Sequence, residues 1–455
     1  MSETIPRVEK KLWYEGANYT ADPVIIDLVA EKLLLVQRAD TGQWGLPGGF
    51  VDVEKGESPL AAATREALEE TGALLVDGGD LVYQGKTTDR RSSETAWVET
   101  SAFAFHLPYT APIFTAEQLD KKEVEDIQWF DLSDLPNDLY GAHDMLIQRA
   151  LDYEASKRLV ATVKNAEHCH AVSGGYMKYD KSIAVAGDQY AFVKQQPTVG
   201  DVSAGRYHDM YTYLEKEAGV MAHLRTHSFN SVPATSLFHN GQLLMDALRT
   251  EDGWEWQVSP ATFDAYLQGV LAALKELETT PLPTDAFSVE PSYESLVQEG
   301  WQLFNYETFT EKAEEFFSHL TQKAEASARA FVADIPELQQ IARTLQDPEE
   351  FVFCHLDMRQ ENLAWHPEKG VRIIDWSWAG PGLPGSDATS LLIDLYKSGH
   401  DVSRYATYIN PQHCLNLMGF WLAHSILPNE GAEGLRLQQF ASALSAYELL
   451  TAAKQ

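Results

Sequence analysis

Residues 65–72 read REALEETG, and this stretch decides the fold of the N-terminal part of the chain. On a helix, Glu66, Glu69 and Glu70 stand at positions i, i+3 and i+4 and share one face. The three carboxylates repel one another, and a Mg²⁺ ion removes the conflict because it prefers oxygen ligands and keeps positions open for phosphate. Arg65 can brace one carboxylate through two hydrogen bonds. The stretch predicts a metal site for phosphate chemistry, and a solvated acidic helix is the alternative.

The residues around this helix predict its limits and its neighbours. Ser58 suits the N-cap before Pro59, and Gly72 suits the end of the helix. Upstream, Pro23–Ala30 and Leu33–Arg38 read as two strands joined by a tight turn. The other expected elements are a loop over residues 44–49, strands at 80–85, 96–106 and 126–131, and a helix over 141–157. The first domain then ends near residue 150.

The stretch from Glu57 through Ala73 resembles the Nudix box, G-x5-E-x7-R-E-U-x-E-E-x-G-U, of the Nudix hydrolase family. Seven residues rather than five separate Gly49 from Glu57, which changes the loop but not the helix. The resemblance implies a mixed sheet between helices and hydrolysis of a nucleoside diphosphate linked to another group. It further implies that the metal is held by Glu57, Glu66, Glu69 and Glu70, the last two being the catalytic candidates.

Residues 89–100 read DRRSSETAWVET and resemble the D-P-R-N-x-x-N-A-W-x-E-T stretch of certain ADP-ribose pyrophosphatases. Ser92 and Thr95 stand where that pattern has Asn. The resemblance implies that Arg91 and Trp97 help to bind substrate, with a surface arginine and a packed core tryptophan as the alternatives. The candidate substrate-binding residues of this domain are Gly49, Arg65, Arg91 and Trp97.

A second signature lies about 290 residues further on, where residues 355–362 read HLDMRQEN and residues 373–376 read IIDW. Phosphoryl transfer from ATP needs an Asp that accepts the hydroxyl proton and oxygen ligands for Mg²⁺. Asp357 suits the first role, and Asn362 and Asp375 suit the second. His355 would brace the loop, and Asp387 further on completes the set. The alternative for each residue alone is an Asp or Asn that caps a loop.

This set resembles the aminoglycoside phosphotransferase and choline kinase family, which is related to the protein kinases, over roughly residues 160–455. Leu356 occupies a position where that family often has Gly. The resemblance implies that Lys194, in the strand-like run 190–194, binds phosphates. It further implies that Glu217, on a helix expected over 203–227, is the partner of that lysine, with Glu215 as a competitor.

The rest of this region is expected to form a small sheet-rich lobe and a large helical lobe. Strand-like runs span residues 160–196, and Asn240-Gly241 is a strong hairpin signal before Leu243–Met245. By the resemblance, Ser173-Gly174-Gly175 covers the phosphates and residues 243–248, with Met245, form the hinge that holds adenine. From residue 260 the chain is mainly helical, apart from a strand-like patch at 351–376.

Composition limits the partners. The 455 residues carry a net charge of −32, which argues against binding nucleic acid or an anionic membrane because phosphate groups would be repelled. The N-terminus lacks signal-peptide features and no apolar stretch is long enough to cross a bilayer, so we expect a cytoplasmic protein. Cys169, Cys354 and Cys414 are expected to be reduced thiols. His168-Cys169-His170 has no second ligand pair, so a structural role is favoured over a metal site.

The sequence therefore predicts an α+β and α/β multidomain protein. Residues 1–150 are expected to form a Nudix fold, and residues 151–455 a bilobal protein-kinase-like fold with lobes over about 160–250 and 251–455. The predicted function is that of a bifunctional enzyme, which uses Mg²⁺ or Mn²⁺ and takes ATP as phosphoryl donor. Its substrates would be a small nucleotide, ADP-ribose above all, and a small-molecule hydroxyl. The alternatives are a Nudix domain that senses a nucleotide and regulates the kinase, or a chain with one active site.

Overall fold

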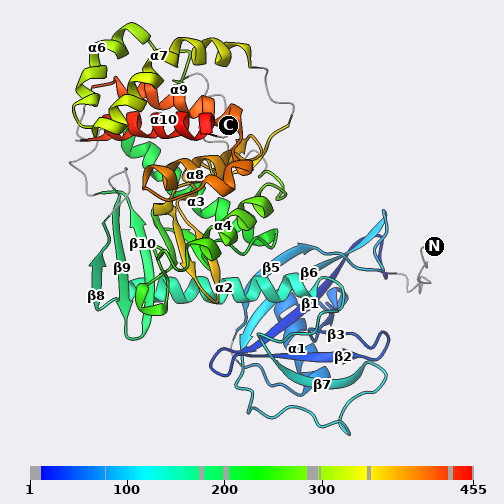
Figure 1. Ribbon diagram of the computed structural model, residues 1–455. Helices are drawn as coiled ribbons and strands as arrows, with labels where there is room; N and C mark the ends of the chain where they lie inside the picture. Colours follow the sequence, from blue (N-terminus) through cyan, green and yellow to red (C-terminus); the bar gives the residue numbers. More distant parts are fainter. Residues whose placement is uncertain are drawn as a thin grey trace. The chain divides into compact units, whose positions relative to one another are not determined.

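The computed structural model describes residues 12–76, 78–173, 179–197, 204–283, 296, 299–345, 350–428 and 434–452 (Figure 1). The chain forms two compact units, Met1–Arg158 and Leu159–Gln455, here called unit 1 and unit 2. Helix α2 (His143–Lys164) contains the division between them. In the described part of the chain, no helix is both long enough and apolar enough to cross a membrane.

Unit 1 is built on a seven-stranded mixed sheet with the strand order β3-β2-β1-β6-β5. Strand β4 pairs with β1 and β7 pairs with β2. Strands β1 and β6 are parallel, whereas the other pairs are antiparallel. The strands are β1 (Gly16–Asp27), β2 (Lys32–Arg38), β3 (Trp44–Gly45), β4 (Gly49–Phe50), β5 (Asp80–Lys86), β6 (Ala96–His106) and β7 (Val124–Asp131).

Helices cover both faces of this sheet, because successive residues of a strand point to opposite sides. Helix α1 (Pro59–Thr71) packs against the face that carries Ile25 and Leu34. The part of α2 that belongs to unit 1 packs against the face that carries Val24 and Leu33. The prediction of a mixed sheet between helices is confirmed.

The limits of α1 are those that the sequence predicts. The hydroxyl oxygen of Ser58 accepts a hydrogen bond from the amide of Ala61 at 3.2 Å, and Pro59 is the first helical residue. Gly72 has a φ of 72°, and its amide donates to the carbonyl of Leu68 at 3.0 Å. This ending needs a left-handed backbone, which glycine adopts without steric cost.

Two predictions about local structure are wrong. The segment 44–49, expected to be loop, contributes the short strands β3 and β4, because its backbone groups find partners on β2 and β1. Residues 160–164, expected to begin a strand, continue α2 instead. Leu159 and Val163 recur at helical spacing and pack on the sheet of unit 2, which favours the helix over the strand.

Unit 2 begins with a five-stranded antiparallel sheet in the order β11-β12-β10-β9-β8. Asn240 and Gly241 form the predicted hairpin turn, with φ values of 49° and 81°. Gly174 and Gly175, expected to cover phosphates, lie outside the described residues. The elements of this lobe are β8 (His168–Ala171), β9 (Asp180–Ala186), β10 (Gln189–Gln195), α3 (Ala204–Thr226), β11 (Ser236–His239) and β12 (Gln242–Asp246).

The rest of unit 2 is mainly helical, and one large apolar core joins its helices to α3. Phe440 lies near the centre of this core, with its ring stacked on that of Phe316 at 4.9 Å. The elements, shown in green to red in Figure 1, are α4 (Phe263–Leu277), α6 (Tyr306–Phe317), α7 (Gln322–Thr344), β13 (Val352–Cys354), β14 (Leu363–His366), β15 (Gly370–Ile373), β16 (Gly380–Gly382), α8 (Ser386–Lys397), α9 (Pro411–Ser425) and α10 (Leu435–Ala452).

Burial of His413 on α9 predicts a loss of stability in acid. Burial lowers the pKa of His413 to about 3, whereas an unfolded histidine has a pKa near 6.5. Between these values the unfolded chain binds more protons than the folded one, so stability falls as the pH falls from 6.5 towards 3. We expect His413→Gln to remove up to about 1.4 kcal/mol per pH unit from that slope, measured by urea unfolding. His170→Gln, in the exposed strand β8, is the control and should leave the slope unchanged.

Candidate active sites

Arg65 holds three of the glutamates that the sequence places at the first site. Its guanidinium donates to Glu57 at 2.7 and 3.0 Å, to Glu66 at 2.7 Å and to Glu69 at 3.0 Å. It also donates to the carbonyl of Phe50 at 3.1 Å, which ties α1 to the loop before it. These bonds raise the pKa of Arg65 and lower the pKa of Glu57, Arg65 being the main cause of the second shift.

Glu70 has no bond to Arg65 among the described contacts and is bound instead by the glycine loop. Its carboxylate accepts the amide of Gly48 at 3.0 Å. Burial raises the pKa of Glu70 to about 8 and also raises the pKa of Glu66, because neither group is fully compensated by a cation. A β-carbon at Gly49 would collide with the carboxylate of Glu66, so a larger residue there would displace that side chain.

The carboxylates suit a hard divalent ion by their chemistry, but in this structure they are not arranged as a complete set of metal ligands. Among the described residues, no three His, Cys, Asp or Glu side chains are arranged as a metal centre. Arg65 supplies the positive charge for Glu57, Glu66 and Glu69 in this arrangement. Carboxylate oxygens are nevertheless the ligands that Mg²⁺ prefers, and the raised pKa of Glu70 indicates a buried carboxylate that a cation would stabilise.

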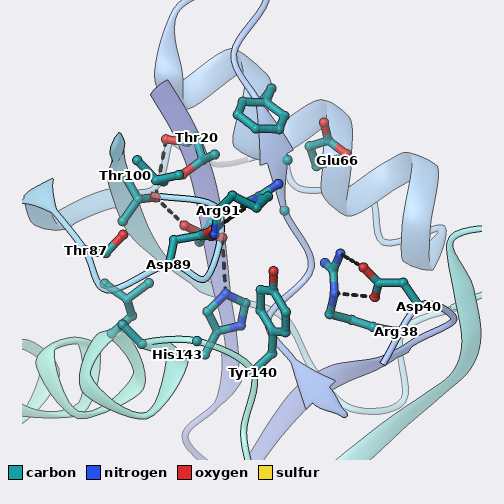
Figure 2. A pocket seen from close by; sticks show the side chains of 18 of the residues that line it. Thr20, Arg38, Asp40, Glu66, Thr87, Asp89, Arg91, Thr100, Tyr140 and His143 are labelled. Atoms are coloured by element: carbon teal, nitrogen blue, oxygen red, sulfur yellow. Dashed lines mark hydrogen bonds and ion pairs between the residues drawn. The ribbon is translucent and has the colours of Figure 1, made fainter. Parts of the chain in front are cut away.

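A pocket of about 630 Å³ lies beside these glutamates in unit 1. Arg38 donates to Asp40, and its guanidinium lies 4.3 Å from the ring of Tyr140. Arg91 donates to both carboxylate oxygens of Asp89 at 2.9 and 2.8 Å. Figure 2 shows these two arginine–aspartate pairs at the pocket, with Tyr140 close to both in this view. The pocket therefore presents cations that can bind phosphate next to the acidic helix.

The pocket brings some of the predicted residues together and leaves others out. Gly49, Glu66, Glu70 and Arg91 line it, whereas Glu57, Arg65, Glu69 and Trp97 are not among the described residues that do. Trp97 donates its indole N–H to Glu99 at 2.8 Å and lies under the ammonium group of Lys86 at 4.9 Å.

Sequence reasoning missed several pocket residues, above all Asp22, Arg38, Tyr140 and His143. Asp22 carried a signal that was not used, since an acidic residue within the strand-like apolar run 21–26 is costly unless it has a role. Arg38 lies about a hundred residues from Tyr140 and His143, and none of the three gave a local signal.

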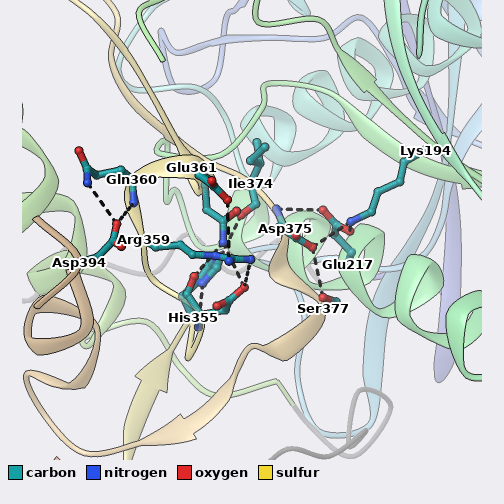
Figure 3. A network of polar contacts seen from close by, with 12 residues as sticks. Lys194, Glu217, His355, Arg359, Gln360, Glu361, Ile374, Asp375, Ser377 and Asp394 are labelled. Carbon is teal, nitrogen blue, oxygen red and sulfur yellow. Dashed lines mark hydrogen bonds and ion pairs between the residues drawn. The ribbon is translucent and has the colours of Figure 1, made fainter. Parts of the chain in front are cut away.

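In unit 2, Lys194 on β10 is buried between two carboxylates (Figure 3). Its ammonium group lies 2.8 Å from Glu217 and 2.9 Å from Asp375. Burial alone would lower the pKa of Lys194, but Asp375 and Glu217 outweigh it and raise that pKa. For Asp375, burial is likewise outweighed by Lys194, so the pKa of Asp375 falls below its usual range. The amide of Asp375 donates to Glu217 at 3.0 Å, which closes the triangle.

Of the two candidate partners of Lys194, the structure selects Glu217. Glu217 is buried on α3, whereas Glu215 is exposed on the same helix. Met245 on β12 is also buried and belongs to the large apolar core.

His355 and Asp387 fix the loop that precedes Asp357. The amides of His355 and Leu356 donate to the carboxylate of Asp387 at 2.6 and 2.9 Å. The His355 ring accepts the amide of Asp357 at Nδ1, at 3.3 Å, and donates from Nε2 to the carbonyl of Ile374 at 2.9 Å. Leu356 has a φ of 63°, a left-handed value that favours glycine, so these bonds hold a strained turn.

Asp357 lies next to Asn362 and Arg359. The amide nitrogen of Asn362 donates to the carbonyl of Asp357 at 2.8 Å, and the guanidinium of Arg359 donates to its carboxylate at 3.0 Å. Burial raises the pKa of Asp357 to about 6, although Arg359 acts in the opposite direction. Asp375 has a φ of 65° and begins the turn after β15, where it meets Lys194.

Comparison with known proteins assigns both units to families. Residues 19–150 match the family model of the NUDIX domain, and residues 189–413 match that of the phosphotransferase enzyme family. The chain thus contains a Nudix domain followed by a kinase-like domain of the phosphotransferase enzyme family. One family is of hydrolases and the other of transferases.

Individual relatives cover only part of the chain. It is 36% identical over 103 residues to putative nudix hydrolase 6 of Caenorhabditis elegans, covering 20% of this chain and 39% of that protein. It is 29% identical over 201 residues to the mitochondrial ADP-ribose pyrophosphatase of Rattus norvegicus, covering 35% of this chain and 53% of that protein. The chain thus spans about half or less of these relatives. A solved structure of spectinomycin phosphotransferase with ADP and spectinomycin is 13% identical, covers 66% of this chain and 98% of its own, and has a TM-score of 0.44.

The crowding at Gly48 leads to a prediction for unit 1. A β-carbon at Gly48 would lie 2.6 Å from Asp22 Oδ1 and 2.7 Å from the carbonyl oxygen of Ala21, and the φ of Gly48 is 152°. We expect Gly48→Ala to destabilise unit 1 by about 1–3 kcal/mol, measured by thermal unfolding, because the strand or the loop must move. Gly78→Ala is the control, since its β-carbon would meet nothing within 4 Å, and an equal loss there would contradict the explanation.

The buried ion pair leads to a prediction for unit 2. Glu217→Gln keeps an oxygen that can accept the amide of Asp375 but removes one charge from Lys194. We expect a loss of about 1–3 kcal/mol in stability, because Lys194 retains Asp375, and weaker binding of ATP as measured by calorimetry. Glu215→Gln changes an exposed residue of the same helix and should alter neither quantity. Unchanged ATP affinity in Glu217→Gln would show that the pair does not position Lys194 for the nucleotide.

Proposed function

We propose that unit 1 hydrolyses a nucleoside diphosphate derivative in the presence of Mg²⁺ or Mn²⁺, with ADP-ribose as the leading substrate. The observation that carries this proposal is the pocket in which Glu66 and Glu70 lie beside Arg38 and Arg91. It joins carboxylates for a metal with guanidinium groups for phosphate. The similarity to the rat ADP-ribose pyrophosphatase supports the choice of substrate.

In this proposal the residues of α1 and of the glycine loop divide the work. Glu57, Glu66, Glu69 and Glu70 would hold the metal, which when bound would supply water activation and offset charge on the diphosphate. Arg65 keeps Glu57, Glu66 and Glu69 together through the bonds described above. Glu69 and Glu70 are the catalytic candidates, and the amide of Gly48 anchors Glu70 at the pocket. Arg91 lines the substrate side of the site, and Trp97 is assigned to substrate binding by the resemblance alone.

We propose further that unit 2 transfers a phosphoryl group from ATP to the hydroxyl of a small molecule. Lys194, held by Glu217, binds the phosphates of ATP, and Asn362 and Asp375 would hold Mg²⁺. Asp357 takes the proton of the attacking hydroxyl on its carboxylate. The observation that carries this proposal is the triangle of Lys194, Glu217 and Asp375, which brings together side chains from β10, α3 and the turn after β15.

Two single substitutions in the full chain test both proposals. We expect Glu70→Gln to reduce release of AMP from ADP-ribose at least about 100-fold and to spare ATP-dependent phosphorylation. Asp357→Asn should do the reverse, measured as ADP formed from ATP across a panel of sugars, nucleosides and amino alcohols. Glu125→Gln, an exposed residue of β7, is the control and should affect neither activity.

The same assays separate the alternatives. Tight binding of ADP-ribose without release of AMP by the unchanged protein would favour a nucleotide sensor, and the arginine that occupies the carboxylates of α1 is compatible with that reading. Loss of both activities in either variant would contradict two independent sites.

A further inference from the structure

Asp22 and His143 lie opposite each other in the wall of the unit 1 pocket, and the proposed hydrolysis has no use for them so far. Asp22 comes from β1 and His143 is the first residue of α2. Both side chains are nearly buried, with exposed fractions of 10% and 12%, and both line the pocket. Asp22 Oδ1 lies 3.7 Å from His143 Nε2, which is too far for a direct hydrogen bond.

The position of the proton on His143 is fixed by its other ring nitrogen. Nδ1 accepts the backbone amide of Leu46 at 2.7 Å, and an amide can only donate. Burial lowers the pKa of His143 to about 3, so the ring is neutral and carries its single proton on Nε2. A β-carbon at Gly45 would lie 2.8 Å from Nδ1, so the strand before Leu46 is close-packed on the ring. His143 therefore points a fixed N–H donor towards Asp22.

Asp22 offers the matching acceptor. Its Oδ2 accepts the hydroxyl of Thr100 in a short hydrogen bond, which leaves Oδ1 turned towards His143. Gly48 leaves the space in front of Oδ1 open, because a β-carbon there would lie 2.6 Å away. Arg38, Arg91 and Glu66 are the charged groups that act on this carboxylate, and they line the same pocket. The Nε2–H donor of His143 and the Oδ1 acceptor of Asp22 thus face the same buried part of the pocket.

We propose that Asp22 and His143 form a subsite that binds a sugar hydroxyl of the substrate. The hydroxyl oxygen accepts the Nε2 proton of His143 and the hydroxyl proton is donated to Asp22 Oδ1. One oxygen atom can lie within hydrogen-bonding distance of two atoms that are 3.7 Å apart. A hydroxyl is neutral and is both donor and acceptor, whereas a phosphate oxygen would be repelled by the carboxylate. This subsite rests on the proposed hydrolysis, because it selects the sugar of the nucleoside diphosphate derivative.

The hydroxyl can come from either sugar of such a substrate, so three substrates are compared with the full-length protein and Mg²⁺. They are ADP-ribose, its analogue deoxygenated in the adenosine ribose, and its analogue deoxygenated in the terminal ribose. We expect one of the two analogues to lose at least about 10-fold in kcat/KM, because the buried donor and acceptor are then left unpaired. Equal kcat/KM values for all three substrates would overturn the proposal.

Variants of Asp22 and His143 test whether these two residues cause the difference in kcat/KM between the substrates. Asp22→Asn keeps the shape but replaces an acceptor by an amide, and we expect the ratio between ADP-ribose and the affected analogue to fall towards one. His143→Asn retains an oxygen near the position of Nδ1 for the amide of Leu46 but removes the Nε2 donor, so it should also lose the discrimination. His143→Gln places its side-chain amide near the position of Nε2 and should keep part of the difference in kcat/KM between ADP-ribose and the affected analogue. An unchanged ratio in both Asn variants would contradict the assignment.

Two further measurements separate a folding defect, or a failure of the proposed hydrolysis, from a loss of the subsite. Thermal unfolding of each variant, compared with that of the unchanged protein, reports whether unit 1 is still folded. If the unchanged protein hydrolyses none of the three substrates, the proposed hydrolysis fails, but the subsite is still tested by calorimetric binding of the same compounds. Equal affinities in that experiment would overturn the subsite as well.

Discussion

One cation that binds several carboxylates is the interaction on which each site depends. In unit 1, Arg65 bonds to Glu57, Glu66 and Glu69, and in unit 2, Lys194 bonds to Glu217 and Asp375. In each site the cation fixes the positions of the carboxylates, but its single positive charge does not neutralise all of them. Burying a charge that is incompletely paired costs several kcal/mol, so such an arrangement is maintained against stability. A site that must grip a divalent ion and a phosphate needs this surplus of negative charge.

The strained turn before Asp357 illustrates a second cost. A non-glycine residue in the left-handed region costs about 1–2 kcal/mol, and Leu356 adopts such a backbone. The two hydrogen bonds that Asp387 accepts from successive amides more than offset this cost, since hydrogen bonds to charged groups contribute about 1.5–3 kcal/mol each. Asp387 thus acts through the backbone, and it sets the direction in which Asp357 leaves the turn.

The parts that the sequence predicts are those that local rules determine. Helix α1 could be placed to the residue because Ser58 and Gly72 signal its ends. The pair of Lys194 and Glu217 is expected from the resemblance to the phosphotransferase family, and Glu215 is an equally local alternative. The opposition of Asp22 and His143 could not be predicted in this way. It arises because α2 packs on the sheet that contains β1 and because the amide of Leu46 donates to the His143 ring. Both contacts join segments that are distant in the chain, so no local sequence pattern predicts them.

The negative net charge of the protein has the same consequence for both candidate sites. A protein of charge −32 repels diphosphates and ATP at long range, yet at physiological ionic strength exposed charges are screened beyond about 8 Å. Binding is then decided by the groups within that distance. Arg38 and Arg91 in the first pocket, and Lys194 and Arg359 in the second site, each stand against a carboxylate that holds them in place. The acidic residues therefore orient the cations to which the proposed functions assign phosphate binding.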